Sequence, residues 1–135
     1  MCDAYGRCDE RRALLRAMLE REDVTIMVPY PVLAERPLSG RDGHRCIDGL
    51  EFVPFEIRAA KILADEIGAK AALRDERPRR RRHRLKYDAM IVATAKAWGA
   101  GCILSNDVDV RRMARMIELE CLDWPEFVTP ARSDC

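Results

Sequence analysis

The chain has 135 residues, 48% of them apolar, and this size predicts one domain, residues 1–135, with a single hydrophobic core. No apolar run approaches the roughly 20 residues of a membrane-spanning helix, and we expect no signal peptide, because the amino terminus lacks an apolar segment. The six cysteines show no CxxC spacing, and we assign no role to the two histidines, His44 and His83. We therefore expect neither a zinc site nor a disulfide scaffold, but free thiols in the cytoplasm.

The formal net charge of +1 conceals a local asymmetry. Residues 74–86 contain eight arginines and lysines and two acids, a charge of +6, whereas the rest of the chain has 16 basic and 21 acidic residues, a charge of −5. The basic charge is therefore concentrated in one segment rather than spread over the surface.

The first half of the chain alternates between helical and strand patterns. Asp9 can cap a helix whose apolar residues recur at helical spacing, and a β-branched apolar run then indicates a buried strand. Pro31 suits the first turn of a short helix, because that position needs no backbone N–H. In chain order we predict a helix at 10–21, a strand at 24–28, a short helix at 31–36, a weak helix in the polar segment 40–49 and a strand at 50–53.

The second half continues this alternation. A strong helical pattern ends before Gly68, a residue type that often follows a helix, and Asp88 opens an apolar helical segment. We predict a helix at 55–67, a loop at 69–86, a helix at 88–98, a strand at 102–104, a helix at 109–117 and a strand at 117–122. Strands that alternate with helices predict an α/β fold, with a parallel sheet and helices on its faces.

Several side chains are better explained by packing than by ligand binding. We expect Met90, Ile91 and Trp98 in the core, and Cys102 and Cys121 as buried thiols within strands.

Acidic residues stand at the ends of the predicted elements. Asp88 opens the helix 88–98, and Asp107 and Asp109 follow the strand 102–104. The start of such a helix and the end of such a strand lie at the same edge of a parallel α/β layer, so these carboxylates should converge. Carboxylate and water oxygens are the ligands that Mg²⁺ and Mn²⁺ prefer. Taken singly, each aspartate is also explained as a helix cap.

Three segments of the chain together resemble the PIN domain, and more narrowly the toxin ribonucleases of bacterial type II toxin–antitoxin pairs. The resemblance implies a PIN-like three-layer α/β/α sandwich with a mainly parallel central sheet. The segments are the run from Val24 to Glu35, the run from Tyr87 to Ala95 and the run from Leu104 to Asp109.

The resemblance implies a set of site residues. The family's second, third and fourth acids fall on Glu35, Asp88 and Asp107, with Asp109 as an accessory acid, and Ser105 replaces a usual threonine that helps to order the site. Glu35, Asp88 and Asp107 would hold Mg²⁺ or Mn²⁺, and metal-activated water would hydrolyse RNA phosphodiester bonds. Glu35 alone is also explained as a solvated surface residue.

The same resemblance implies partners. We expect an RNA substrate, a homodimer and a cognate antitoxin protein that silences the enzyme, with no membrane association. The alternatives are a catalytically inactive or truncated PIN-like domain that binds RNA or protein, and a different α/β phosphotransfer domain that uses Asp88 or Asp107. The chain lacks a Gly-rich phosphate loop, which weighs against enzymes of nucleoside triphosphates.

The chain departs from the family at its amino terminus. The family opens with a central strand that ends in its first acid, and Asp3 is the one candidate here, with two residues before it. Either Asp3 is a metal ligand after a shortened lead-in, or the first strand is absent. Its absence would leave two strands of the sheet without a neighbour.

An arginine run directly precedes Asp88 in the sequence. Such a run would hold the phosphate backbone of RNA beside the acidic site. The alternatives are a solvated flexible loop and a loop that is sensitive to proteases or contacts the antitoxin. The candidate RNA-binding residues are Arg77, Arg79, Arg80, Arg81, Arg82 and Arg84.

Overall fold

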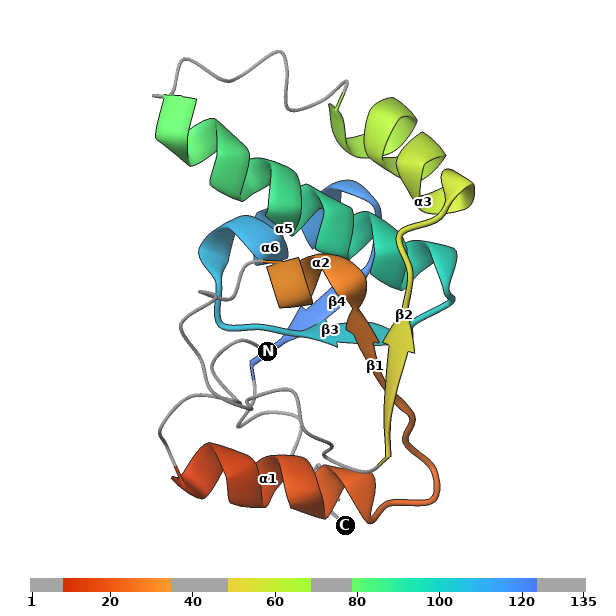
Figure 1. Ribbon diagram of the computed structural model, residues 1–135, viewed down its shortest axis with the longest axis vertical. Helices are drawn as coiled ribbons and strands as arrows, with labels where there is room; N and C mark the ends of the chain where they lie inside the picture. Colours follow the sequence, from red (N-terminus) through yellow and green to blue (C-terminus); the bar gives the residue numbers. More distant parts are fainter. Residues whose placement is uncertain (1–8, 35–48, 69–78, 124–135) are drawn as a thin grey trace, which may run out of the picture.

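The computed structural model describes residues 9–34, 49–68 and 79–123 (Figure 1). Within these ranges every helix is too short or too polar to span a lipid bilayer. The predictions for 35–36, 40–48 and 69–78 lie outside them. In chain order the elements are α1 (Asp9–Leu19), β1 (Ile26–Pro29), α2 (Tyr30–Ala34), β2 (Leu50–Val53), α3 (Ile57–Ile62), the π-helix η2 (Leu63–Gly68), α5 (Arg79–Ala97), β3 (Cys102–Leu104), α6 (Val108–Met116) and β4 (Glu120–Leu122).

The strands of the described residues form two separate parallel pairs. β1 pairs with β2, with Val28 opposite Phe52, and β3 pairs with β4, with Ile103 opposite Cys121. Parallel neighbours need a long crossover connection, and α6 supplies it between β3 and β4. α5 contacts both β1 and β3 and runs across the molecule beside both pairs, whereas α1 lies at the opposite end (Figure 1). The parallel pairing therefore agrees with the predicted α/β class.

Strand boundaries depart from the predictions where neighbouring turns intervene. β2 and β3 have the predicted bounds, whereas β1 begins two residues late, at Ile26, and includes Pro29. β4 begins at Glu120 rather than at 117, because Ile117 caps α6 and Glu118 has a left-handed φ of 57°. A left-handed residue turns the chain away from the helix axis, so the strand starts only after it.

The predicted loop 69–86 is wrong in its second half. α5 has 19 residues and begins at Arg79, so the arginine-rich segment that precedes Asp88 is helical. Arginine has a high helix propensity, and no proline or glycine interrupts residues 79–98. The apolar second half of α5 is packed in the core, and a helix extends from such a nucleus by one hydrogen bond per added residue.

The predicted helix 55–67 is divided into two types of helix. The α-helical part, α3, ends at Ile62, and the wider π-helix η2 then includes Gly68, which we predicted to follow the helix. A Cβ atom at Gly68 would lie 3.0 Å from the carbonyl oxygen of Leu63, so glycine permits this close approach. Both segments contact α5, which places the change of helix type against the core.

The main core lies where α3, α5 and α6 meet. Each of these helices contributes a fully buried alanine, Ala59, Ala93 and Ala114, and such small residues let helices approach closely. A smaller cluster joins α1 to β1 and consists of Leu15, Met18 and Ile26.

The prediction that Trp98 lies in the core is wrong. Its side chain is 39% exposed, and the indole N–H donates a hydrogen bond to the carbonyl oxygen of Pro54 at 3.1 Å. An indole has an apolar body and one polar N–H, so it suits a position at the edge of the core. Met90 and Ile91, also expected in the core, are half-buried, and Cys102 and Cys121 are free, half-buried thiols in β3 and β4.

Candidate metal centre

Three carboxylates, one from α5 and two from the start of α6, meet at one point of the structure. Asp88 lies in the middle of α5, Asp107 immediately precedes α6, and Asp109 lies in the first turn of α6. One carboxylate oxygen of each residue lies within 4.8 Å of the others. Asp88 is buried, Asp109 is half-buried and Asp107 is exposed, so the cluster extends from the interior to the solvent.

Asp88 is the innermost of the three acids. It is 5% exposed, and the alternative that it caps a helix is wrong, because α5 begins nine residues earlier. Aspartate is a poor residue for a helix interior, since its side chain competes for backbone hydrogen bonds. A buried carboxylate is also unfavourable unless nearby groups compensate its charge. The position of Asp88 is therefore better explained by the cluster than by helix formation.

Asp107 does cap a helix. Its Oδ1 atom accepts hydrogen bonds from the backbone N–H groups of Asp109, at 2.8 Å, and Val110, at 3.2 Å. Its own backbone N–H donates to Oγ of Ser105 at 3.1 Å. The cap uses one carboxylate oxygen and fixes the side chain, so capping and participation in the cluster are compatible.

Asp109 is placed by the helix that Asp107 caps. Its carboxylate faces the guanidinium of Arg112, one turn later in α6, at 3.4 Å. This positive charge offsets part of the repulsion among the three carboxylates.

A cavity of about 580 Å³ adjoins the cluster. Residues 24–27 line it on one side and residues 102–105 on the other, so it lies between the two strand pairs. Asp88 and Asp107 contribute to its wall, beside the carboxyl end of β3. This volume is within the range of ligand-binding pockets, which is roughly 300–1,000 Å³.

Other predicted site residues are not tested by this geometry. Glu35, Asp3 and Arg77 lie outside the described residues. Ser105 is buried beside the cluster, at the end of β3. The remaining candidate RNA-binding residues belong to the first turns of α5 and are Arg79, Arg80, Arg81, Arg82 and Arg84.

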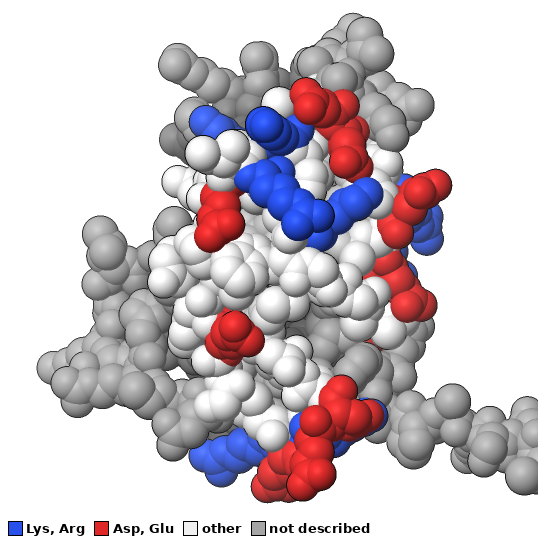
Figure 2. Space-filling model, turned by 90° about the vertical axis from the view of Figure 1, so that its right-hand side faces the viewer, with Lys and Arg blue, Asp and Glu red and all other residues white. Residues whose placement is uncertain are grey.

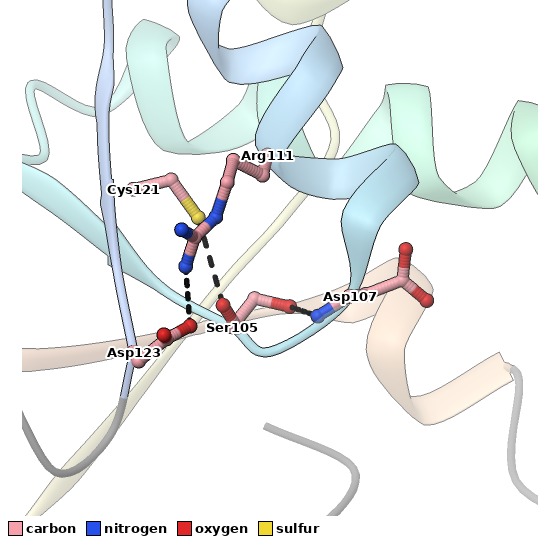
Figure 3. Close-up of polar contacts among 5 residues, drawn as sticks. All are labelled: Ser105, Asp107, Arg111, Cys121 and Asp123. Atoms are coloured by element: carbon pink, nitrogen blue, oxygen red, sulfur yellow. Dashed lines mark hydrogen bonds and ion pairs between the residues drawn. The ribbon is translucent and has the colours of Figure 1, made fainter.

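Sequence reasoning missed a group of contacts that lies behind the loop between Ser105 and Asp107. Arg111 forms an ion pair with Asp123, and the thiol of Cys121 donates to the carbonyl oxygen of Ser105 at 3.8 Å (Figure 3). The one available signal was position: Asp123 follows the last strand, as Asp107 follows β3. Nothing in the sequence showed that Arg111 would form an ion pair with Asp123.

The amino-acid sequence matches the PIN domain family over residues 3–116. The chain belongs to this family. PIN domains have an α/β/α fold and are generally metal-dependent nucleases, and the three clustered acids agree with that chemistry. No curated protein and no solved structure matches the chain.

The side chains of this PIN domain fit a divalent metal ion. Three carboxylates supply the hard oxygen ligands of Mg²⁺ or Mn²⁺. Two unit charges at 4.8 Å repel by roughly 3 kcal/mol at an effective dielectric constant of about 20. A divalent cation would turn this repulsion into attraction. Asp88 would hold it from the interior, and Asp107 and Asp109 from the solvent side.

Proposed function

We propose that this PIN domain is a metal-dependent endoribonuclease that hydrolyses RNA phosphodiester bonds. The observation that carries the proposal is the convergence of Asp88, Asp107 and Asp109 within 4.8 Å in a chain of this family. A bound Mg²⁺ or Mn²⁺ would lower the pKa of a water molecule and stabilise charge on the leaving oxygen. The three acids that cluster in the described part of the chain are all aspartates, and a metal-activated water needs no imidazole base.

The three aspartates would have different roles in this reaction. Asp88 is rigidly placed in the middle of a packed helix, so it would fix the depth of the metal. Asp107 is fixed through its cap hydrogen bonds and would use its second oxygen as a ligand. Asp109 is the accessory acid, and Arg112 orients it from the same helix. Glu35 would complete the set as the family's second acid.

RNA would approach along α5. Positions 81 and 84 precede Asp88 by seven and four residues, a spacing that places them on the same side of a helix. At 1.5 Å per residue they lie roughly 10 and 6 Å from Asp88 along the axis. Arginines there would hold phosphates of the strand whose scissile bond lies at the acids, and would offset the repulsion between the acids and RNA.

The biological role belongs to the same proposal. The similarity of residues 24–35, 87–95 and 104–109 to the toxin ribonucleases supports a homodimeric toxin that a cognate antitoxin protein silences. A protein that binds RNA through α5 without cutting it is the competing function, favoured by the arginine-rich start of α5.

Cleavage of a mixed pool of structured RNAs tests the proposal. The reactions contain Mg²⁺, Mn²⁺ or EDTA, and compare the natural chain with Asp88→Asn and with a control, Glu66→Gln, whose ion pair to Lys96 joins η2 to α5. We expect metal-dependent cleavage that Asp88→Asn abolishes and Glu66→Gln retains, with all three proteins folded by circular dichroism. Cleavage by Asp88→Asn would refute its assigned role, and no cleavage by any folded protein would favour the binding function.

A further inference from the structure

A group of contacts behind the metal centre links α6 to the end of β4. Arg111 belongs to the first turns of α6, and its guanidinium pairs with Asp123, which directly follows β4 (Figure 3). The Cys121 thiol, in β4, donates to the carbonyl oxygen of Ser105. In Figure 3 the carboxylate of Asp107 points away from this group, on the far side of the loop.

Backbone hydrogen bonds connect this group to the metal-binding carboxylates. The N–H of Arg111 donates to the carbonyl oxygen of Asp107 at 3.1 Å, and the N–H of Ser105 donates to the carbonyl oxygen of Leu122 at 3.0 Å. Residues 105–107 are therefore held by α6 on one side and by β4 on the other. The ion pair of Arg111 with Asp123 joins these two supports directly.

We propose that Arg111 and Asp123 are positioning residues, which hold the start of α6 so that Asp107 and Asp109 face Asp88. This inference rests on the proposed function, because it concerns the ligands of the proposed metal. Asp123 stands at the carboxyl end of a strand, as Asp107 does, but its carboxylate serves Arg111 and is not among the three clustered acids. It therefore acts through Arg111 on the geometry of the ligands.

The solvent exposure of the Arg111–Asp123 pair distinguishes a positioning role from a contribution to the stability of the fold. The side chains of Arg111 and Asp123 are 32% and 39% exposed. Ion pairs with this exposure contribute little to the free energy of unfolding, because water screens them and both side chains lose freedom. Loss of the pair should therefore leave the melting temperature almost unchanged while it alters the metal site.

Mn²⁺ affinity of the folded protein, measured by electron paramagnetic resonance, tests the inference. We compare the natural chain with Arg111→Gln, Asp123→Asn and the double variant. Partners of metal ligands usually change affinity by about 10- to 100-fold, so we expect each single variant to weaken Mn²⁺ binding by roughly tenfold. The double variant should be no weaker than either single variant, because the two residues act as a unit.

The direction of the Arg111→Gln effect is decisive. If the pair acted only through its charges, removal of the arginine would strengthen binding of a cation, whereas removal of the aspartate would weaken it. Positioning predicts that both substitutions weaken it. Glu66→Gln is the matched control, since Glu66 is 40% exposed and pairs with a lysine away from the acids. Unchanged or tighter binding by Arg111→Gln would overturn the inference.

Amide hydrogen exchange in metal-free protein gives a readout that does not depend on the metal. The N–H groups of Asp109 and Val110 are bonded to Asp107, so a displaced start of α6 should speed their exchange several-fold. Val92 in α5 serves as the internal reference. If the natural chain bound no Mn²⁺, the proposed function would fail. Faster exchange in both variants would still support the positioning role, and unchanged exchange would refute it.

Discussion

Asp107 combines a helix cap with a place in the acidic cluster, and two substitutions separate these roles. Asparagine caps a helix as well as aspartate does, but it has no charge. We expect Asp107→Asn not to lower the free energy of unfolding, because it keeps the cap and removes one charge from the cluster, and to lose metal-dependent cleavage. Asp107→Ala removes the hydrogen bonds to Asp109 and Val110 as well, and should lower stability by about 1 kcal/mol.

Urea denaturation and Mn²⁺ titration of the same samples measure the two roles of Asp107. Ser105→Ala is a useful companion, because it removes the hydroxyl that accepts from the Asp107 N–H but leaves all three acids in place. It should retain some metal binding. If Asp107→Asn bound Mn²⁺ as tightly as the natural chain, Asp107 would be a cap alone.

The two described thiols should be poor nucleophiles. Burial raises the pKa of Cys102 and of Cys121, and the nearby carboxylate of Glu120 raises that of Cys102 further, whereas Arg111 opposes part of the increase at Cys121. Because the thiolate is the reactive form, both should react with iodoacetamide at pH 8.5 more slowly than an unfolded cysteine. Peptide mapping by mass spectrometry, with and without urea, measures this difference, and equal rates in both conditions would contradict it.

The same pKa shifts make stability depend on pH in the alkaline range. The folded state holds these protons more tightly than the unfolded chain does, so the unfolded chain releases them first as pH rises. Their contribution to stability is complete below the unfolded-state pKa and is lost as pH rises through the folded-state pKa. The melting temperature should therefore decline above about pH 8.5, the ordinary pKa of a thiol.

At this scale the sequence predicted what local spacing determines. Asp107 and Asp109 lie close together because they are only two positions apart at the start of a helix. Asp88 was expected beside them because the start of a helix and the end of a parallel strand lie at the same edge of an α/β layer. The pairing of Arg111 with Asp123 spans the turn between α6 and β4, and no periodic pattern encodes it.

Among the elements, α5 joins the proposed RNA-binding segment to the acidic cluster. Neutral substitution of its arginines should weaken RNA binding without a large change in fold, because glutamine retains helix propensity. For single-stranded RNA, each arginine that no longer neutralises a phosphate should reduce the slope of log affinity against log salt by about 0.7. The variant carries Arg80→Gln, Arg81→Gln, Arg82→Gln and Arg84→Gln.

Fluorescence anisotropy in EDTA measures this binding without cleavage. A control variant neutralises four basic residues in other elements, and consists of Arg16→Gln, Lys61→Gln, Arg58→Gln and Arg115→Gln. Both variants have the same net charge, so a difference in their RNA binding shows that the position of the basic residues matters. Equal salt slopes for the two variants would refute a specific role of the α5 arginines.

The boundaries of an element could be predicted only where adjacent residues, such as glycine or proline, end it. Gly49 and Pro54 flank β2, and its bounds match the prediction. The π-helical turn at 63–68 and the early start of α5 depend instead on packing between helices, which a single-sequence pattern does not contain. The arginine run was predicted to be a loop, and the high helix propensity of arginine was not weighed against its charge.

For the whole molecule, the sequence predicted one central sheet, and the described residues contain two parallel pairs with a cavity between them. No strand of the described part lies between β1 and β3. The family's first strand would precede α1, and the role of Asp3 remains a prediction.

On the side of β2, charged side chains gather toward the two ends and uncharged surface occupies most of the middle (Figure 2).

Metal binding should stabilise the whole fold, because the proposed ligands lie in α5 and at the start of α6, and these two helices also form the main core. At 100 times the Kd, a ligand that binds only the folded state contributes about 2.7 kcal/mol. We therefore expect Mn²⁺ to raise the melting temperature by several degrees and EDTA to reverse the rise. Differential scanning fluorimetry, with Ca²⁺ as a comparison ion, measures it.

Asp88→Asn supplies the control for this rise in melting temperature. Its expected effect on the melting temperature differs between the metal-free and the Mn²⁺-bound protein. Without metal the substitution removes a charge that lies within 4.8 Å of two others, so it should leave the melting temperature unchanged or higher. With Mn²⁺ the variant should gain no stability, since it has lost the innermost of the proposed ligands. A variant that is less stable without metal, yet still stabilised by Mn²⁺, would show that Asp88 supports the core and that the ion binds elsewhere.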